Sequence, residues 1–369
     1  MARKPYILTD FDTNNPMGEY FRFRGIEYDF LPDEPTSPLV DQIAHRIDGK
    51  DNVYLVFGAL DTLRRLYDER SKINDFATIG EKHNLVIFGS NKMTSESLNP
   101  LSEFSKDDPD YADWLNSMEP VILVEGIAGE FFKKSYPNCE FIQVFTAMLV
   151  PRFNNPQLAI LKDHRPDKDY FCLMNERGAR PYRKILHQRL STEGLTDNAI
   201  YKFARRNDNT YDDLIPQYPE GIAKSLGFGG GQIFPPIHYY NRTNFELVAE
   251  TFTQTNHDET FFLSEKTLKP ISMKHPFMIL SNYNHLKNLH DMGFKTFHEH
   301  VDESYDNKTD FNERIDIIIK NLKTLIGNSQ GFYTNTKEIR EHNHRHLQYM
   351  IGGWKTALWK GLDKFWRNI

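Results

Sequence analysis

The sequence predicts an α/β protein with two parallel-sheet domains and a helical carboxy-terminal end. Short, nearly continuous apolar runs recur along the chain, and most are separated by stretches long enough for a helix. The chain has 369 residues, of which 39% are hydrophobic and 13% aromatic, so two domains of ordinary size can each bury a core. After residue 311 the pattern changes to long amphipathic helices.

The amino-terminal half contains apolar runs with the character of buried parallel strands. These runs lie at residues 6–9, 53–58, 85–89, 121–125 and 141–145. They are nearly all apolar because, in a parallel sheet, helices cover both faces of each strand. Helical patterns occur between some of them, at 41–47, 60–70 and 111–117. We expect a first α/β domain at residues 1–160.

The carboxy-terminal half repeats the alternation of strands and helices. A polar, proline-containing segment at 151–168 has the composition of a linker. Strands are expected at 170–174, 199–203, 245–250 and 277–280, and helices at 180–190, 265–274 and 282–292. The tail carries an apolar helical stripe made of Ile315, Ile318, Ile319, Leu322 and Leu325. We expect a second α/β domain at 161–330 and closing helices at 331–369.

Charge and composition argue against several classes of protein. The net charge of −6 does not indicate a general nucleic-acid binder, which needs a local excess of lysine and arginine. Cys139 and Cys172 are too few for a disulfide framework. No stretch reaches the roughly 18 apolar residues of a membrane-spanning helix, and the first residues lack the apolar run of a signal peptide. We therefore expect a cytoplasmic protein, and the sequence does not indicate its oligomeric state.

The segment FFLSEKTLKPISMKHPFMIL, residues 261–280, is the most informative motif. Its apolar start gives way to Ser264, Glu265 and Lys266 at the expected start of a helix, and a buried strand follows. These side chains are candidates for holding an anionic ligand, because helix-start N–H groups and a lysine favour phosphate, while a glutamate accepts hydrogen bonds from ribose. Pro270 fits this helix only if it falls in the first turn. The alternative interpretation is a surface helix whose first turn carries a charge pair.

This motif resembles the donor-binding motif of fucosyltransferase-like and viral (phage) sugar transferases. A second match lies upstream at residues 170–190, where YFCLMNERGARPYRKILHQRL resembles the strand, asparagine and arginine-rich helix of the same enzymes. The resemblance covers roughly residues 170–304. It implies the GT-B fold, in which two Rossmann-like domains face a cleft. It also implies an inverting glycosyltransferase that uses a nucleotide sugar, such as a UDP or GDP sugar, as co-substrate and requires no metal or other cofactor.

The resemblance assigns donor-binding roles to residues of the second domain. Lys266, Arg177 and Arg183 are expected to neutralise the diphosphate, with Arg183 on the helix after the first strand of this domain. Asn175 and Arg177 follow that strand, where ligands gather in open α/β sheets. Glu265 matches the residue expected to bind the ribose. The alternative for Arg183 is a place on a solvated helix face.

Acidic residues after strands of the first domain are the candidates for the general base that takes the acceptor's proton. Asp10 and Asp12 follow the first expected strand, and Glu125 ends the fourth. Acids at strand ends also serve as helix caps, which is the alternative role for Asp12. The expected acceptor is a surface glycan or a hydroxymethylated base in viral DNA. The DNA acceptor requires a basic rim and extrusion of the base.

Other functions remain open from the sequence. The start YILTDFDT also suits a haloacid-dehalogenase-type phosphatase with Asp10 as nucleophile and Asp12 as acid/base, although Thr13 is one place early for that pattern. The same Asp-x-Asp suits a metal-dependent, single-domain sugar transferase of the other major fold. A further alternative is an inactive glycan-binding protein that has the GT-B fold.

Overall fold

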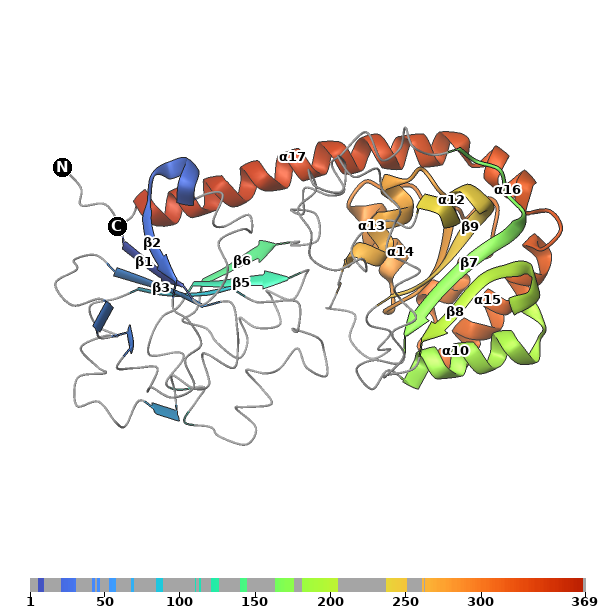
Figure 1. Ribbon diagram of the computed structural model, residues 1–369, viewed down its shortest axis with the longest axis horizontal. Helices are drawn as coiled ribbons and strands as arrows, with labels where there is room; N and C mark the ends of the chain where they lie inside the picture. The colour runs from blue at the N-terminus through green and yellow to red at the C-terminus, as the bar shows by residue number, and fades with distance from the viewer. Residues whose placement is uncertain are drawn as a thin grey trace. The chain divides into compact units, whose positions relative to one another are not determined.

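The protein folds into two α/β units, each built on a parallel sheet (Figure 1). In this computed structural model the first unit comprises Met1–Thr146 and Thr356–Ile369, and the second comprises Ala147–Lys355. The structure describes residues 6–9, 21–30, 42–43, 45–46, 53–57, 68–69, 84–88, 110, 113, 121–125, 140–144, 163–175, 181–204, 237–250, 261 and 263–367. The expected fold class, α/β with two parallel sheets and carboxy-terminal helices, is confirmed.

The first unit contains a six-stranded parallel sheet with the order β2-β1-β3-β4-β5-β6. Its strands are β1 (Tyr6–Thr9), β2 (Glu27–Phe30), β3 (Val53–Phe57), β4 (Asn84–Phe88), β5 (Val121–Glu125) and β6 (Glu140–Val144). All except β2 match the apolar runs of the sequence to within one residue. The chain passes from β1 to β2 on one side and returns to β3 on the other. A topological switch point, where open α/β sheets bind ligands, therefore lies between β1 and β3.

The strand β2 was not expected from the sequence. It reads Glu-Tyr-Asp-Phe and lies at the edge of the sheet, where Asp29 is exposed. An edge strand is less completely covered than an inner strand, so it tolerates charged side chains. The pattern of continuous apolar runs finds the other five strands, including β6 at the opposite edge, and misses β2, whose charged residues interrupt the pattern.

The second unit contains a four-stranded parallel sheet with the order β10-β9-β7-β8. Its strands are β7 (Lys168–Asn175), β8 (Ala199–Ala204), β9 (Thr243–Ala249) and β10 (Phe277–Leu280). The chain reverses direction across the sheet after β8, so the switch point of this unit lies between β7 and β9. Every residue of β9 and β10 is buried, as expected for strands covered on both faces.

Helices pack around the second sheet (Figure 1). The helices of the second unit are α10 (Pro181–Thr192), α12 (Ile237–Arg242), α13 (Glu265–Ser272), α14 (His285–Asp291), α15 (Phe311–Leu325) and α16 (Ser329–Asn335), with short 3-10 helices η3 (Leu195–Asn198) and η5 (Ser304–Asn307). A last helix, α17 (Lys337–Arg367), begins in the second unit, and its residues from Thr356 on belong to the first. The apolar stripe predicted for the tail lies on α15 and is buried. Among the described helices, none combines the length and hydropathy needed to cross a membrane.

The helix α13 differs from its expected form at Pro270. Pro270 lies inside the helix, beyond its first turn, so the expectation that it falls in the first turn is wrong. Its effect is limited because α13 ends soon afterwards, at Ser272, and few backbone hydrogen bonds remain to be lost. Lys274, with a φ of 50°, then turns the chain towards β10.

Candidate functional site

The candidate site begins at Ser264, the residue that caps the start of α13. Its hydroxyl accepts a hydrogen bond from the backbone N–H of Lys266 at 3.1 Å, and its own backbone is extended, with φ −95° and ψ 176°. Serine is favoured at this place because its side-chain oxygen satisfies an N–H group that has no partner within the helix. The cap fixes where the helix starts, and it thereby orients the following residues, Glu265 and Lys266.

Glu250 lies next to this cap, directly after β9, and is completely buried, with a relative exposure of 0%. Its Oε1 accepts hydrogen bonds from the N–H of Ser264 at 3.2 Å and from the hydroxyl of Thr267 at 2.8 Å. Its Oε2 accepts from the hydroxyl of Ser264 at 2.5 Å. A buried carboxylate requires such donors, because burial without them is strongly unfavourable. These donors all belong to the start of α13, so Glu250 joins the end of β9 to this helix.

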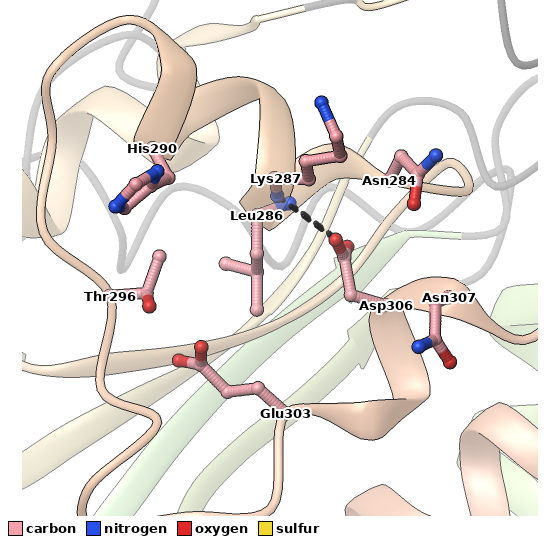
Figure 2. A pocket seen from close by; sticks show the side chains of 8 residues that line it. All are labelled: Asn284, Leu286, Lys287, His290, Thr296, Glu303, Asp306 and Asn307. Carbon is pink, nitrogen blue, oxygen red and sulfur yellow. Dashed lines mark hydrogen bonds between the residues drawn. The ribbon is translucent and has the colours of Figure 1, made fainter.

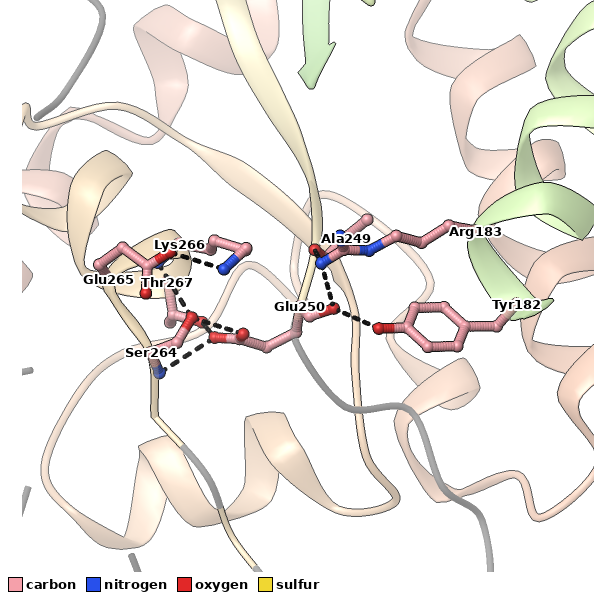
Figure 3. Close-up of polar contacts among 8 residues, drawn as sticks. All are labelled: Tyr182, Arg183, Ala249, Glu250, Ser264, Glu265, Lys266 and Thr267. Carbon is pink, nitrogen blue, oxygen red and sulfur yellow. Dashed lines mark hydrogen bonds and ion pairs between the residues drawn. The ribbon is translucent and has the colours of Figure 1, made fainter. Parts of the chain in front are cut away.

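The backbone carbonyl of Glu250 is held from the opposite side by the first turn of α10 (Figure 3). The hydroxyl of Tyr182 donates to this carbonyl at 2.9 Å, and Nη2 of Arg183 donates to it at 3.1 Å. The same nitrogen lies 3.3 Å from the carbonyl oxygen of Ala249. Arg183 is only 1% exposed, so its guanidinium supports the end of β9 from inside the protein. Its expected contact with a diphosphate stays a prediction.

Glu265 and Lys266 form a partly exposed ion pair in the first turn of α13. The Nζ of Lys266 lies 2.6 Å from Oε1 of Glu265, and the two side chains are 25% and 30% exposed, respectively. Burial acts to raise the pKa of Glu265, but the charges of Lys266 and Lys269 outweigh burial and hold this pKa at about 2. Glu265 is therefore ionised at neutral pH, and its carboxylate is a hydrogen-bond acceptor only.

Two N–H groups at the start of α13 are engaged within the protein. The N–H of Ser264 donates to Glu250, and the N–H of Lys266 donates to the hydroxyl of Ser264. The sequence suggested that helix-start N–H groups favour a phosphate. In the structure the carboxylate of Glu250 lies at the start of α13, where a helix favours an anion. These N–H groups are therefore not available to a ligand in this arrangement, whereas the charged side chains of Glu265 and Lys266 reach solvent.

His285 lies behind Thr267, buried at the start of α14. Its Nδ1 lies 2.9 Å from Oγ of Ser281, and its Nε2 lies 3.4 Å from Oγ1 of Thr267. Because the Thr267 hydroxyl donates to Glu250, it accepts from His285, and this places the imidazole proton on Nε2. Burial lowers the pKa of His285 to about 4, so the ring is neutral at pH 7. A chain of hydrogen bonds thus runs from Ser281 through His285 and Thr267 to Glu250.

The other predicted site residues are placed only in part. Asn175 is the last residue of β7, beside the switch point, and its side chain is outside the described residues. Glu125 is the last residue of β5 in the first unit, and its side chain is likewise outside them. Asp10, Asp12 and Arg177 lie outside the described residues altogether.

The structure brings part of the predicted set together around Glu250, which was not predicted. Ser264 and Arg183 both contact Glu250, and Glu265 and Lys266 follow Ser264 directly (Figure 3). A signal for Glu250 was present in the sequence, because it is an acid at the end of an apolar strand. The same signal selects Glu125 in the first domain.

A pocket of about 360 Å³ lies beside α14 (Figure 2). It is lined by Asn284, Leu286, Lys287, His290, Thr296, Glu303, Asp306 and Asn307. Asp306 caps α14, since its carboxylate accepts from the N–H groups of Leu286 at 2.9 Å and Lys287 at 3.0 Å, and Glu303 accepts from the N–H of Phe297 at 2.7 Å. Both acids thus satisfy local backbone groups.

Within the part of the chain that the structure describes, no group of three or more His, Cys, Asp or Glu side chains is arranged to hold a metal ion.

No protein-family model matches the sequence, and no curated protein is significantly similar to it. Among solved structures, the catalytic domain of starch synthase IV from Arabidopsis thaliana, bound to ADP and acarbose, is similar with a TM-score of 0.41 and 8% sequence identity. The match covers 87% of this chain and 76% of the other. A likeness at this level establishes neither a family nor a function.

Proposed function

We propose that this protein is a glycosyltransferase that moves a sugar from a nucleotide-sugar donor to an acceptor hydroxyl. The observation that carries the proposal is the partly exposed Glu265–Lys266 pair, which the buried contacts of Glu250 hold beside the end of β9. This end of the sheet borders the switch point between β7 and β9, the place where open α/β sheets bind ligands. The resemblance of the same segment to sugar transferases supports the proposal.

In this proposal the charge pair binds the nucleoside diphosphate part of the donor. The ionised carboxylate of Glu265 accepts hydrogen bonds from the ribose hydroxyls. The ammonium of Lys266 lies beside the diphosphate and offsets the negative charge that grows on this leaving group in the transition state. Ser264 contributes by capping the helix that carries both. Asn175 and Arg177, which follow β7 across the switch point, are proposed as further contacts of the donor.

The acceptor side of the reaction is proposed for the first unit. The general base is one of Asp10, Asp12 and Glu125, which follow or end parallel strands of that unit. We propose inversion at the sugar carbon and no requirement for a metal, because lysine and arginine can supply the positive charge that a metal supplies in other transferases. The proposed acceptor is a surface glycan or a hydroxymethylated base of viral DNA.

A thermal-shift panel of UDP, GDP, CMP and dTDP sugars tests the proposal. A ligand at 100 times its Kd stabilises a fold by about 2.7 kcal/mol, which raises the Tm measurably. We expect one nucleoside diphosphate sugar to raise the Tm and to be hydrolysed slowly without an acceptor. Binding without hydrolysis would indicate a binding protein instead, and a lack of response to every sugar would overturn the proposal. Hydrolysis of a phosphate monoester that is lost in Asp10→Asn would support the phosphatase alternative.

A further inference from the structure

We propose that Glu250 is a positioning residue for donor binding, and that its buried carboxylate sets the place of the first turn of α13 and, through it, of Glu265 and Lys266. This inference rests on the proposed function, because it concerns the same donor site. Glu250 does not face a ligand itself, since its exposure is 0%. Its effect on a ligand is therefore exerted through the residues that it holds.

One turn of α13 supplies three hydrogen bonds to the Glu250 carboxylate. The N–H and the hydroxyl of Ser264 and the hydroxyl of Thr267 donate to it at 3.2, 2.5 and 2.8 Å. Ser264 comes immediately before the charge pair in the sequence, and Thr267 comes immediately after it. The carboxylate thus contacts α13 on both sides of Glu265 and Lys266, at the backbone and hydroxyl of Ser264 and at the hydroxyl of Thr267.

Glu250 can serve as a fixed point because its own backbone is anchored. Its N–H donates to the carbonyl of Leu280 at 2.9 Å, so it is tied to the end of β10. Its carbonyl accepts from Tyr182 and Arg183, so it is also tied to the first turn of α10. Through Glu250, the position of α13 is therefore fixed relative to the sheet and to α10. A shift of the carboxylate would move the helix start, and with it the charge pair.

Three donors point at the Glu250 carboxylate, two at Oε1 and one at Oε2. A carboxylate offers only acceptor oxygens, and it satisfies the Ser264 N–H, the Ser264 hydroxyl and the Thr267 hydroxyl together. A carboxamide of the same shape presents an NH₂ group to at least one of these donors. Glu250→Gln is therefore a sharp test, since it keeps the volume of the side chain and disturbs the hydrogen bonds to α13.

The experiment titrates wild-type protein and Glu250→Gln with UDP and with GDP in a calorimeter. We expect the Kd of the nucleotide that binds wild-type protein to rise about tenfold or more in Glu250→Gln. Unchanged affinity in this variant overturns the inference and leaves the proposed function intact. Failure of wild-type protein to bind either nucleotide or any sugar of the panel overturns both. If Glu250→Gln does not fold, Thr267→Val removes one of the donors, and a smaller rise in Kd is expected.

Glu246→Gln is the matched control. Glu246 lies on β9, four residues before Glu250 and hence on the same face of the sheet, and it is also buried. Its Oε2 accepts from the hydroxyl of Tyr240 at 2.7 Å, a contact that involves neither Ser264 nor Thr267. We expect the nucleotide Kd of this variant to stay within about twofold of wild type. An equal loss of affinity in both variants would show a general effect of buried acids and would overturn the inference.

A double-mutant cycle with Lys266→Ala separates positioning from general destabilisation. If Glu250 acts by placing the charge pair, Glu250→Gln has less effect once the Lys266 ammonium is absent. The rise in nucleotide Kd that Glu250→Gln causes should then fall from about tenfold in the wild-type background to below about threefold in the Lys266→Ala background. Fully additive losses would mean that Glu250 acts independently of Lys266, which contradicts the proposal.

Discussion

Glu250 and Ser264 are joined by two hydrogen bonds, one from the Ser264 N–H to Oε1 at 3.2 Å and one from the Ser264 hydroxyl to Oε2 at 2.5 Å. Glu250 follows a buried strand, and Ser264 caps the helix that carries the Glu265–Lys266 pair. A fully buried acid thus determines the position of partly exposed charges. The relationship predicts effects of single substitutions on ligand binding and on stability.

Lys266→Ala is expected to raise the Kd for the nucleoside diphosphate by at least about tenfold, because a hydrogen bond to a charged group contributes about 1.5–3 kcal/mol. Calorimetric titration measures this directly. Lys287→Ala is the control, since Lys287 also lies near a helix start and is also paired with an acid, Asp291, at 2.6 Å. The same loss in both variants would argue for a non-specific charge effect.

Glu265→Ala is expected to remove a preference for ribose over 2′-deoxyribose. Under the proposed function the wild-type carboxylate, which a pKa of about 2 keeps ionised, would accept hydrogen bonds from the ribose hydroxyls, so a ribonucleotide should bind more tightly than its 2′-deoxy analogue. Competition between the two nucleotides, repeated with the variant, measures the preference. Retention of the preference in Glu265→Ala would assign ribose recognition to another residue.

Arg183→Met is expected to lower the free energy of unfolding by about 2 kcal/mol. The substitution keeps much of the buried volume but removes a charged donor from the carbonyls of Ala249 and Glu250, and a hydrogen bond from a charged group contributes about 1.5–3 kcal/mol. The carbonyl of Glu250 keeps its hydrogen bond from Tyr182. Arg189 is on the same helix as Arg183, and Arg189→Met, which removes a partly exposed pair with Asp316 of α15, is expected to cost less than about 1 kcal/mol. Denaturant unfolding of both variants provides the comparison, and equal costs would contradict the supporting role of Arg183.

Glu246→Gln is expected to flatten the pH dependence of stability. Burial raises the pKa of Glu246 to about 8 from an ordinary value of 4.5. The folded protein keeps this proton up to about pH 8, and the unfolded chain releases it above about pH 4.5, so the wild-type fold loses stability as the pH rises through this window. The Tm of the variant relative to wild type should therefore increase from about pH 5 to about pH 8. A constant difference would mean that Glu246 titrates normally.

Gly293→Ala is expected to destabilise the second unit more than Gly194→Ala. Both glycines have positive φ, 95° and 66°, so alanine strains the backbone at either position. A methyl group at position 293 would also lie 2.8 Å from the ring of His346, whereas position 194 has nothing within 4 Å. His346 contacts the carbonyl of Met292 at 2.7 Å, so moving its ring adds about 1 kcal/mol to the cost. Similar Tm values for the two variants would contradict the close contact.

The sequence predicts the inner strands and the start of α13 well because both depend on local composition. Inner parallel strands are covered on both faces, so β1 and β5 appear as apolar runs with the observed ends. Ser264 is a favoured cap, so the helix start is visible from residue types alone. The edge strand β2 is not visible in this way because its charged side chains break the apolar pattern.

The role of Arg183 could not be read from the sequence because it depends on contacts between distant segments. Its partner, the carbonyl of Glu250, is 67 residues away along the chain. A helix position alone does not tell whether an arginine points to solvent or into the fold, and both interpretations remained open. The role of Glu250 could not be read from the sequence for the same reason, because its partners Ser264 and Thr267 lie 14 and 17 residues away and meet it only in the folded chain.

The continuous helix α17 bears on the order in which the chain folds during synthesis. It begins at Lys337 in the second unit, and its residues from Thr356 on belong to the first, so the first unit combines segments from both sides of the second. Domains generally fold as they leave the ribosome, starting with the earliest complete one. The second unit therefore emerges whole while the first still lacks its final helical segment. Chains truncated just before Thr356 and released from the ribosome should already resist protease in the second unit and remain sensitive in the first.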